Sequence, residues 1–280
     1  MRSSWVLAIA FVMSFCLTDC KKGGGSNAIN ATGGQSSSMI KSYEVIITDT
    51  LLLNTSSDYV YSFSYDNSNR ELTASQTGTD IYKGVSTNLS FSAQFTYSQN
   101  TQTETSTLQR GAVSSNGNSV YYLNSAGYPT KLVSNIIVGT INAVTTTLFS
   151  YDANGYCTEM DNSSVSNNVA QPATKTIFTI SGGNVVQEDN YWATGSLIST
   201  IAFSFGNSSN NTILRFSTPP VAGHLNNNLV TSSNSSAGGV PRSALHFSYV
   251  LDSKGRVTNA TVSTTGGKTY MQYKNIQYLN

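Results

Sequence analysis

Hydrophobic and polar residues alternate with a period of two along most of the chain from Ser42 onward. Between Tyr59 and Asp66, aromatic residues occupy every odd position, and Val, Ser or Asp occupies every even one. The segment from Leu245 to Asp252 has a similar pattern. Strict alternation with aromatic and β-branched residues is typical of half-buried strands. Beyond the N-terminal region, no longer segment carries an apolar stripe at helical spacing, so the pattern predicts an all-β fold.

Short polar segments interrupt this alternation at a regular interval. In three of them an Asx residue is followed three positions later by Gly, starting at Asn124, Asp152 and Asp252. Anchor positions at 66, 124, 152 and 181 are 58, 28 and 29 residues apart. A period near 29 accommodates two strands of about ten residues and two turns, so the predicted unit is a β-hairpin. In such a turn the Asx side chain caps the backbone and Gly takes the positive φ angle.

The number of these segments predicts an antiparallel up-and-down meander of about 15–17 strands. An open twisted sheet rarely exceeds about 10 strands without curling or splitting. We therefore expect the meander to curl into a barrel-like or two-layer form.

Composition narrows the class of protein further. Ser, Thr, Asn and Gly make up 126 of the 280 residues, charged residues make up 10 %, and the formal net charge is +1. A nucleic-acid binder needs clustered Lys and Arg, and 15 scattered cations do not provide them. Disorder needs low hydrophobicity and high net charge, whereas this chain is 39 % hydrophobic and nearly neutral. These numbers favour an uncharged, turn-rich protein outside the cytoplasm.

The N-terminus predicts export. Residues 1–19 combine one Arg with an apolar run that is too short to span a membrane, as in a signal peptide. A Leu three residues before Cys20 is similar to a bacterial lipobox, in which the Cys is lipidated. We expect a flexible tether over residues 20–41, rich in Gly and Ser, and one β-hairpin-repeat domain over residues 42–280.

The expected partner of this terminus is a membrane, which the chain reaches through the lipid on Cys20. The alternatives are a cleaved but unlipidated secretory protein and an uncleaved anchor. Surface lipoproteins of this type often have acidic residues just after the Cys, whereas this chain has Lys21 and Lys22. We therefore expect an outer-membrane lipoprotein on the periplasmic face rather than on the cell surface.

The turn sequence resembles a known repeat. Residues 151–158 follow the pattern Tyr-Asp-x-x-Gly-Tyr-x-Thr, which looks like the YD repeat of RHS-type proteins. Together with the lipobox, the Cys-Lys-Lys start and the Tyr-rich C-terminus, the layout is similar to uncharacterised Bacteroidetes-type lipoproteins that have a domain of unknown function with a porin-like fold. The resemblance implies an antiparallel meander that curls. It implies no activity and no site residues.

Two acidic pairs and one aromatic pair are the candidate chemistry of the chain. Glu159 and Asp161 would share one face of a strand, while Glu188 and Asp189 are adjacent in sequence. Paired carboxylates across a cleft could hydrolyse a glycan, although strand-surface acids are ordinary. Tyr191 and Trp192 follow the second pair and could form a platform on which a sugar stacks.

Other site chemistry is not indicated. Cys157 has no partner for a disulfide after export and is expected to pack as a small apolar residue. His224 and His246 have no acid or Cys at metal-ligand spacing, so we predict no metal site and no cofactor. We predict no catalytic residues, and therefore no enzyme.

The sequence leaves three functions open. We expect a non-catalytic, lipid-anchored scaffold of the cell envelope that binds a glycan, a lipid-like ligand or an envelope protein. One alternative is an envelope glycan hydrolase that uses the acidic pairs. The other is a transmembrane β-barrel of the outer membrane, because such barrels also alternate with a period of two.

Overall fold

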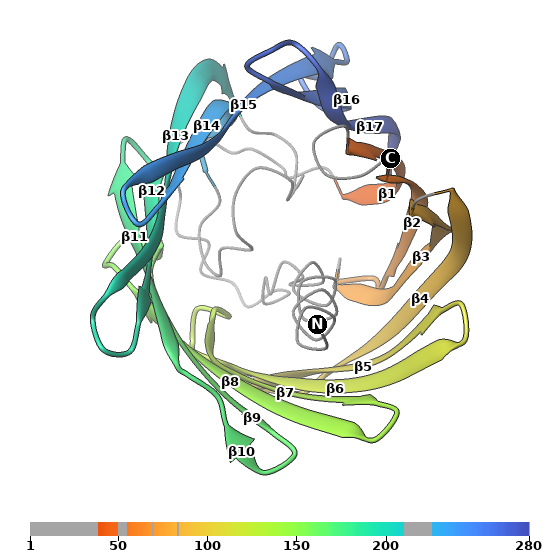
Figure 1. Ribbon diagram of the computed structural model, residues 1–280, viewed down its shortest axis with the longest axis vertical. Coiled ribbons are helices and arrows are strands. Elements are labelled where there is room, and N and C mark those ends of the chain that lie inside the picture. The colour runs from red at the N-terminus through yellow and green to blue at the C-terminus, as the bar shows by residue number, and fades with distance from the viewer. Residues whose placement is uncertain (1–38, 50–54, 69, 83, 210–225, 280) are drawn as a thin grey trace.

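The computed structural model describes residues 39–49, 55–68, 70–82, 84–209 and 226–279, and they form one antiparallel β-sheet closed into a barrel (Figure 1). Residues 1–38, which include the predicted signal peptide and Cys20, lie outside the described residues. Among the residues that are described, no helix is long and apolar enough to cross a membrane. The predicted all-β class is confirmed.

The described part of the chain contains sixteen long strands and one short strand. The long strands have 8–13 residues, as the alternating segments predict. In chain order the strands are β1 (Ile40–Asp49), β2 (Thr55–Tyr65), β3 (Glu71–Tyr82), β4 (Val85–Tyr97), β5 (Thr101–Arg110), β6 (Val113–Leu123), β7 (Pro129–Val138), β8 (Ile141–Tyr151), β9 (Cys157–Ser166), β10 (Val169–Ala170), β11 (Thr174–Ser181), β12 (Asn184–Trp192), β13 (Leu197–Ser209), β14 (Asn228–Ala237), β15 (Val240–Leu251), β16 (Val257–Thr264) and β17 (Thr269–Tyr278).

The long strands pair in chain order, and the last strand pairs with the first. β1 is bonded to β2 on one side and to β17 on the other, with Val45 opposite Tyr273. β10 is a two-residue strand that pairs with the end of β9, while β9 itself continues to β11. Of the two predicted forms, the chain therefore adopts the barrel, with sixteen strands around it. Closure pairs the two edge strands, which would otherwise offer free hydrogen-bonding groups to other chains.

Four of the turns at one end of the barrel share a single hydrogen-bond geometry. The turns that begin at Asp66, Asn124, Asp152 and Asp252 lie after β2, β6, β8 and β15. In each, the Asx Oδ1 accepts backbone N–H bonds from the second and fourth residues that follow, at 2.8–3.0 Å. Gly follows three residues after Asn124, Asp152 and Asp252, with φ of 75–85°. The predicted turn chemistry is confirmed at these sites, and we call this end the Asx-turn end.

Tyrosine hydroxyls link neighbouring strands by hydrogen bonds at the Asx-turn end. Each of five hydroxyls donates a hydrogen bond of 2.6–2.8 Å to a carbonyl at the start of the preceding strand. Three of the rings also stack on the residue that precedes their acceptor, which is Arg in two cases and Tyr in one. The donor and acceptor pairs are Tyr65–Ile40, Tyr97–Glu71, Tyr151–Pro129, Tyr249–Val230 and Tyr278–Val257.

The two faces of the sheet differ in burial and in chemistry. On β4 the odd positions from Leu89 to Phe95 are buried, and the even positions from Ser86 to Thr96 are exposed. Cross-strand register carries the face that includes Leu89 from β3 to β8. Only the inner face of a closed barrel is shielded by the barrel itself, so the face of Leu89 and Phe95 is the inner one.

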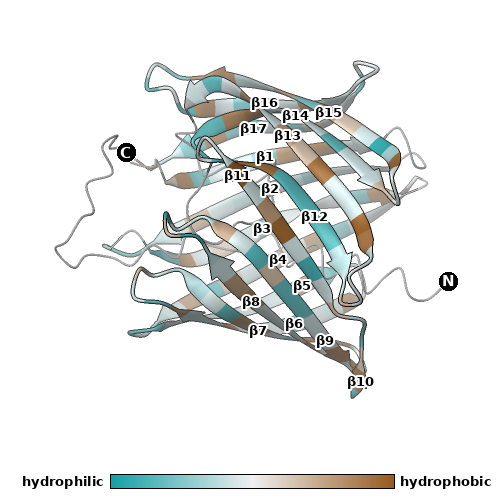
Figure 2. Cartoon of the chain, turned by 90° about the vertical axis from the view of Figure 1, so that its left-hand side faces the viewer, coloured by the Kyte–Doolittle hydropathy of each residue, from teal (hydrophilic) through white to brown (hydrophobic). Residues whose placement is uncertain are grey.

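Apolar side chains gather on the inner face in three clusters. The largest spans β14–β17 and β1 and includes Val45, Phe247, Val262 and Tyr273. A second lies on β3–β5 around Phe91, and a third on β8, β9, β11 and β12. In the first cluster the ring of Tyr43 stacks on Tyr61 of the next strand, with centroids 4.8 Å apart. Figure 2 shows the tilted strands that carry these residues.

Gly78 gives a direct test of the inner-face packing. It lies opposite Tyr59, and a Cβ at this position would come within 2.0 Å of the Asp58 carbonyl oxygen and 2.7 Å of the Tyr59 ring. We expect Gly78→Ala to lower the free energy of unfolding by about 1–3 kcal/mol, because backbone must move to admit the methyl group.

Gly266→Ala is the matched control, since its Cβ would meet only Thr264 Oγ1 at 3.8 Å. We expect a change within about 0.5 kcal/mol there. Denaturant unfolding of both variants checks this, and equal stability of the two would contradict the packing described.

Candidate functional site: the inner face of the barrel

The inner face has an aromatic wall and a polar wall. The aromatic wall lies on β15–β17, β1 and β2 and consists of Phe247, Tyr249, Tyr273, Tyr43, Tyr61 and Phe63. The polar wall runs across β5–β9, β11 and β12. Cross-strand register places its members on the same face as Phe95 and Phe149. It consists of Gln102, Glu104, Ser106, Ser115, Ser119, Ser134, Thr147, Asn162, Thr176 and Asn190.

Side chains of the polar wall bond to one another across the strands. Ser119 donates to Ser134 at 3.0 Å, and Thr147 donates to Asn162 Oδ1 at 2.7 Å. Thr176 donates to Asn190 Oδ1 at 2.7 Å. Because most of these groups are satisfied by a neighbour, the wall can be buried at modest cost. It still presents hydroxyl and amide groups toward the interior.

Glu104 is the acidic residue of the polar wall, and it is buried. Its residue is 3 % exposed, lies opposite Phe95 and Ser119, and has the Tyr121 hydroxyl 3.4 Å from Oε2. No described Lys, Arg or His forms an ion pair with it. Burial raises the pKa of Glu104 to about 7, and hydrogen bonds from Ser106 and Tyr121 offset only part of that effect.

An ion pair between Arg110 and Asp80 lies on the same face, nearer the end of the barrel opposite the Asx-turn end. Arg110 Nη2 is 2.7 Å from Asp80 Oδ2, and the hydroxyl of Ser57 donates to Asp80 Oδ1 at 2.8 Å. Tyr59 also donates to Asp80, and desolvation, followed by this hydrogen bond, raises the pKa of its phenol to about 12. Arg110 and Asp80 therefore neutralise each other and form a structural pair.

Neither predicted acidic pair places both of its carboxyls inside the barrel. Glu188 lies opposite Phe178 on the inner face, whereas Asp189 points outward and accepts a hydrogen bond from Thr200 at 2.6 Å. Adjacent residues of a strand point to opposite faces, so this pair is divided by the sheet. Burial raises the pKa of Glu188.

Glu159 and Asp161 do share a face, as predicted, but it is the outer one. Lys175 Nζ lies 2.8 Å from Glu159 and 3.5 Å from Asp161. The hydrogen bond to Glu159 is the largest cause that raises the pKa of Lys175. This arrangement is a surface ion pair, which contributes little to stability.

Tyr191 and Trp192 do not form one platform. Tyr191 lies opposite Lys175, beside the outer ion pair, while Trp192 lies opposite Thr174 at the end of β12 and is 45 % exposed. Because consecutive strand residues point to opposite faces, a single sugar ring cannot stack on both. Ligand stacking on either ring remains a prediction.

Cys157 is buried as expected and packs against the cluster on β8, β9, β11 and β12. It is 0 % exposed, and burial raises the pKa of its thiol to about 12, so it is not a nucleophile at neutral pH. His246 is exposed on the outer face, and His224 lies outside the described residues. The residues that the structure describes contain no cluster of three metal-ligating side chains.

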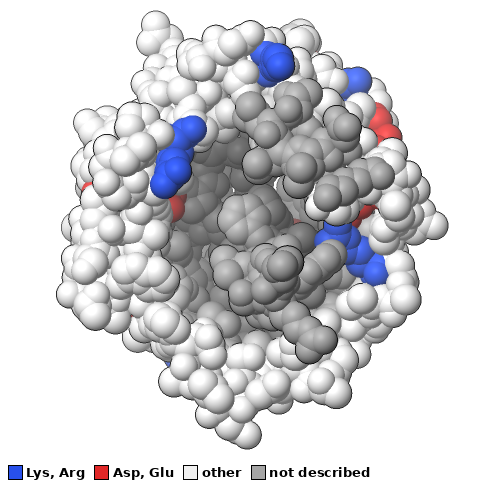
Figure 3. Space-filling model, viewed as in Figure 1, with Lys and Arg blue, Asp and Glu red and all other residues white. Residues whose placement is uncertain are grey.

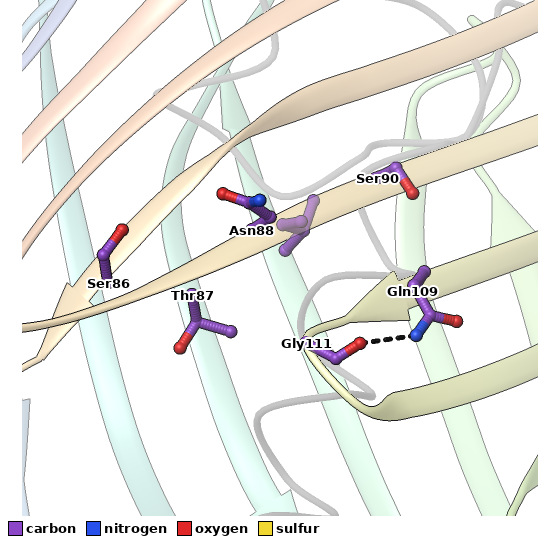
Figure 4. A pocket seen from close by; sticks show the side chains of 7 residues that line it. Ser86, Thr87, Asn88, Ser90, Gln109 and Gly111 are labelled. Atoms are coloured by element: carbon purple, nitrogen blue, oxygen red, sulfur yellow. Dashed lines mark hydrogen bonds between the residues drawn. The ribbon is translucent and has the colours of Figure 1, made fainter.

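A pocket opens near the turn between β5 and β6, at the end of the barrel opposite the Asx-turn end (Figure 4). It is lined by small uncharged residues on β4 and β5, and the Gln109 amide donates to the Gly111 carbonyl beside it. Its lining carries no charged side chain, and its hydroxyl groups are those of Ser86, Thr87 and Ser90. Figure 3 shows that most of the described surface seen along the barrel axis is likewise uncharged.

Comparisons with known proteins identify the fold. No protein-family model matches the chain, and no curated protein matches it significantly. A porin-like protein from Bacteroides uniformis is similar in structure, with a TM-score of 0.59 and 12 % identity over 86 % of this chain and 98 % of that one. A porin-like protein from Bacteroides vulgatus has a TM-score of 0.54 and 11 % identity over 86 % and 99 %.

At this identity the likeness shows the fold alone. The porin-like fold implied by the sequence resemblance is confirmed. The assignments as a lipoprotein and as a carrier of YD-like repeats stay predictions, although four turns share one geometry.

The polar wall was not predicted from the sequence, although the alternation in residues 101–110 indicates part of it. Residues 101–110 read Thr-Gln-Thr-Glu-Thr-Ser-Thr-Leu-Gln-Arg, with Thr at every second position. Placing the Thr residues outward puts Gln102, Glu104 and Ser106 inward, as the structure shows. The segment is easily overlooked because both of its faces are polar.

Glu104 makes stability depend on pH in a defined direction. Its pKa is about 7 in the folded chain and near 4.5 when unfolded, so the folded state binds the proton more tightly between these values. Stability therefore falls as pH rises from about 4.5 to 7. We expect Glu104→Gln to be about 3 kcal/mol more stable than the parent at pH 8 and similar to it at pH 4.5.

Thermal unfolding of parent and variant across this pH range measures the effect. The outer-face variant Glu159→Gln is the control and should not remove the dependence. If Glu104→Gln leaves the pH profile unchanged, the burial described for this carboxyl is wrong.

Proposed function

We propose that this chain is a non-catalytic, exported β-barrel that binds an amphipathic, lipid-like molecule inside the barrel. The observation that carries the proposal is the opposite polarity of the two faces. Aromatic and aliphatic residues line much of the inside, opposite the polar wall, whereas hydroxyl and amide side chains cover the outside of β3–β5.

The outer face argues against the transmembrane alternative. A barrel that spans a membrane needs an apolar outer band about 25 Å tall. On β3–β5 the outward positions are instead almost all hydroxyl or amide side chains, and most of them are exposed. They are Thr73, Ser75, Thr77, Thr79, Ser86, Asn88, Ser90, Ser92, Gln94, Thr96, Thr101, Thr103, Thr105, Thr107 and Gln109. Burying this surface in hydrocarbon would leave many polar groups without hydrogen-bond partners.

The inner face supports a ligand with one apolar part and one polar part. Barrels of sixteen strands enclose a wide interior, and a water-filled pore would be lined by polar groups on all sides. Here the aromatic wall offers a surface for an acyl chain or ring system, while the polar wall offers hydroxyl and amide groups. Of the three predicted ligand classes, this combination favours the lipid-like molecule over a glycan or a folded envelope protein.

We further propose that the barrel is held at the periplasmic face of the outer membrane by a lipid on Cys20. The support for this proposal comes from the N-terminal sequence alone. Cys20 itself lies outside the described residues. A Gly/Ser-type tether of about 20 residues spans roughly 25 Å. That length would let the barrel take up a lipid-like molecule from the nearby membrane.

Uptake of an apolar fluorescent probe tests this function. The exported protein, purified without detergent, is expected to take up N-phenyl-1-naphthylamine with a rise in fluorescence and to carry amphiphiles that native mass spectrometry detects. Phe203→Ser, a change on the inner face beside the aromatic wall, should weaken uptake several-fold because it removes apolar lining.

The neighbouring residue Ser204 points outward and is exposed, so Ser204→Ala is the control and should bind the probe like the parent. If a folded parent takes up no probe and carries no amphiphile, the proposed function is wrong.

A further inference from the structure

We infer that Glu104 and the polar groups around it on β4–β6 form a site for the amino group of an amphiphile. This inference rests on the proposed function, since it names the head group of the molecule held inside the barrel. It adds a chemical class of ligand and the residue that selects it.

The position of Glu104 is suited to a cationic head group. Its carboxyl lies on the inner face between Phe95 on β4 and Ser119 on β6, and it is 3 % exposed. This carboxyl accepts hydrogen bonds from the hydroxyls of Ser106 and Tyr121. A buried carboxylate needs an opposite charge to be ionised at low cost, and the described residues provide none.

The charged groups on neighbouring strands do not fill this role. Arg110 is the cation of β5 on the same face, but its guanidinium is held by Asp80 at 2.7 Å. The titratable residues on the same face of β6 and β4 are Tyr121 and Tyr97, and a phenol supplies no positive charge. Lys131 on β7 is exposed, points outward and lies over the ring of Tyr122.

A second buried polar group lies on the same face of β6, four residues and roughly 13 Å along the strand from Ser119. Ser115 on β6 is 2 % exposed, and its hydroxyl has no hydrogen-bond partner among the described residues. It lies opposite Leu108 on the face of Glu104. Buried hydroxyls are normally paired, so this one is available to a polar atom of a bound molecule.

The residues on the β6 and β7 side of Glu104 are small. Gly117, opposite Ser106, has no side chain and is half-buried, and Ser134 beyond Ser119 is also half-buried. On the other side lie Phe91 and Phe95 of β4, which belong to the buried apolar cluster on β3–β5. An amphiphile with its amino group at Glu104 and its apolar chain along β4 would pair with the carboxyl and lie beside the two phenylalanines.

Ionisation of Glu104 supports the same chemistry. Burial raises its pKa to about 7, and an ammonium group would lower it by pairing with the carboxylate. Near pH 8 an alkylamine is a cation and Glu104 is largely ionised. The preference for an amine should therefore be greatest near pH 8 and decline as the pH falls below about 7.

Probes that share one chain and differ in head group test the inference. Dodecylamine, dodecanol and dodecyl maltoside are titrated into the exported protein at pH 8 and pH 5, with displacement of N-phenyl-1-naphthylamine as the signal. We expect dodecylamine to bind at least about tenfold more tightly than the other two at pH 8, and this advantage to shrink at pH 5. Glu104→Gln should abolish the advantage and leave dodecanol binding unchanged.

Glu159→Gln removes a carboxyl from the outer face and is the matched control, expected to bind like the parent. If the three probes bind equally, or if the advantage of the amine survives in Glu104→Gln, the head-group inference is wrong while the proposed function stands. If dodecyl maltoside binds best and loses affinity in Glu104→Gln, the amine class is wrong. If no probe binds to folded protein, the proposed function itself fails.

Discussion

Pairing of β17 with β1 is the constraint on which the rest of this structure depends. Ile40 lies opposite Tyr278, so residues more than 230 positions apart close the sheet. Closure turns a long neutral meander, which would otherwise have two free edges, into a barrel with an inside and an outside. In a closed barrel the period-two alternation assigns each residue to the inner or the outer face, and every strand must place its buried residues inward. A slip of one residue anywhere would exchange the faces.

The Asx-turn end is where this register is fixed. Each Asx side chain sets the shape of its turn, and tyrosines near the strand ends bond to the strand before them, so neighbouring hairpins are linked as well as internally paired. Arg70 and Arg256 show how the parts combine, since each pairs with the Asp of its own turn and lies over a Tyr ring of the next hairpin, or of the last strand. The abundance of Tyr in the chain is thereby explained in part by architecture rather than by ligand binding.

Local features of the fold could be predicted from the sequence, and long-range ones could not. The strands, their approximate number and the turns at Asn124, Asp152 and Asp252 follow from alternation and from Asx and Gly chemistry, which act over a few residues. The choice between a barrel and two layers depends on whether the first and last strands meet, which no local pattern encodes. Adjacency of Glu188 and Asp189 suggested a pair, yet the strand period already implies that they point apart.

The candidate site was harder to predict for a physical reason. Glu104 acquires its properties from burial on the inner face, and the Thr residues on either side of it make its segment look like an exposed polar strand. Knowledge of which face points inward comes from neighbouring strands, where Phe95 and Leu108 identify the buried side. The same information shows that Glu159 and Asp161, which fitted a catalytic pair by spacing, are outside the barrel.

The outer face of this barrel, which is polar on β3–β5, meets water, and the inner face is enclosed. This difference can be measured directly with spin labels attached to cysteines introduced at Ser90 and Thr105 on the outer face and at Ala93 on the inner face, in Cys20→Ser protein mixed with lipid vesicles. The account predicts that a water-soluble relaxation agent reaches the labels at Ser90 and Thr105, and that the label at Ala93 is shielded from it. Labels at Ser90 and Thr105 that are reached by lipid-soluble oxygen but not by the water-soluble agent would contradict the account.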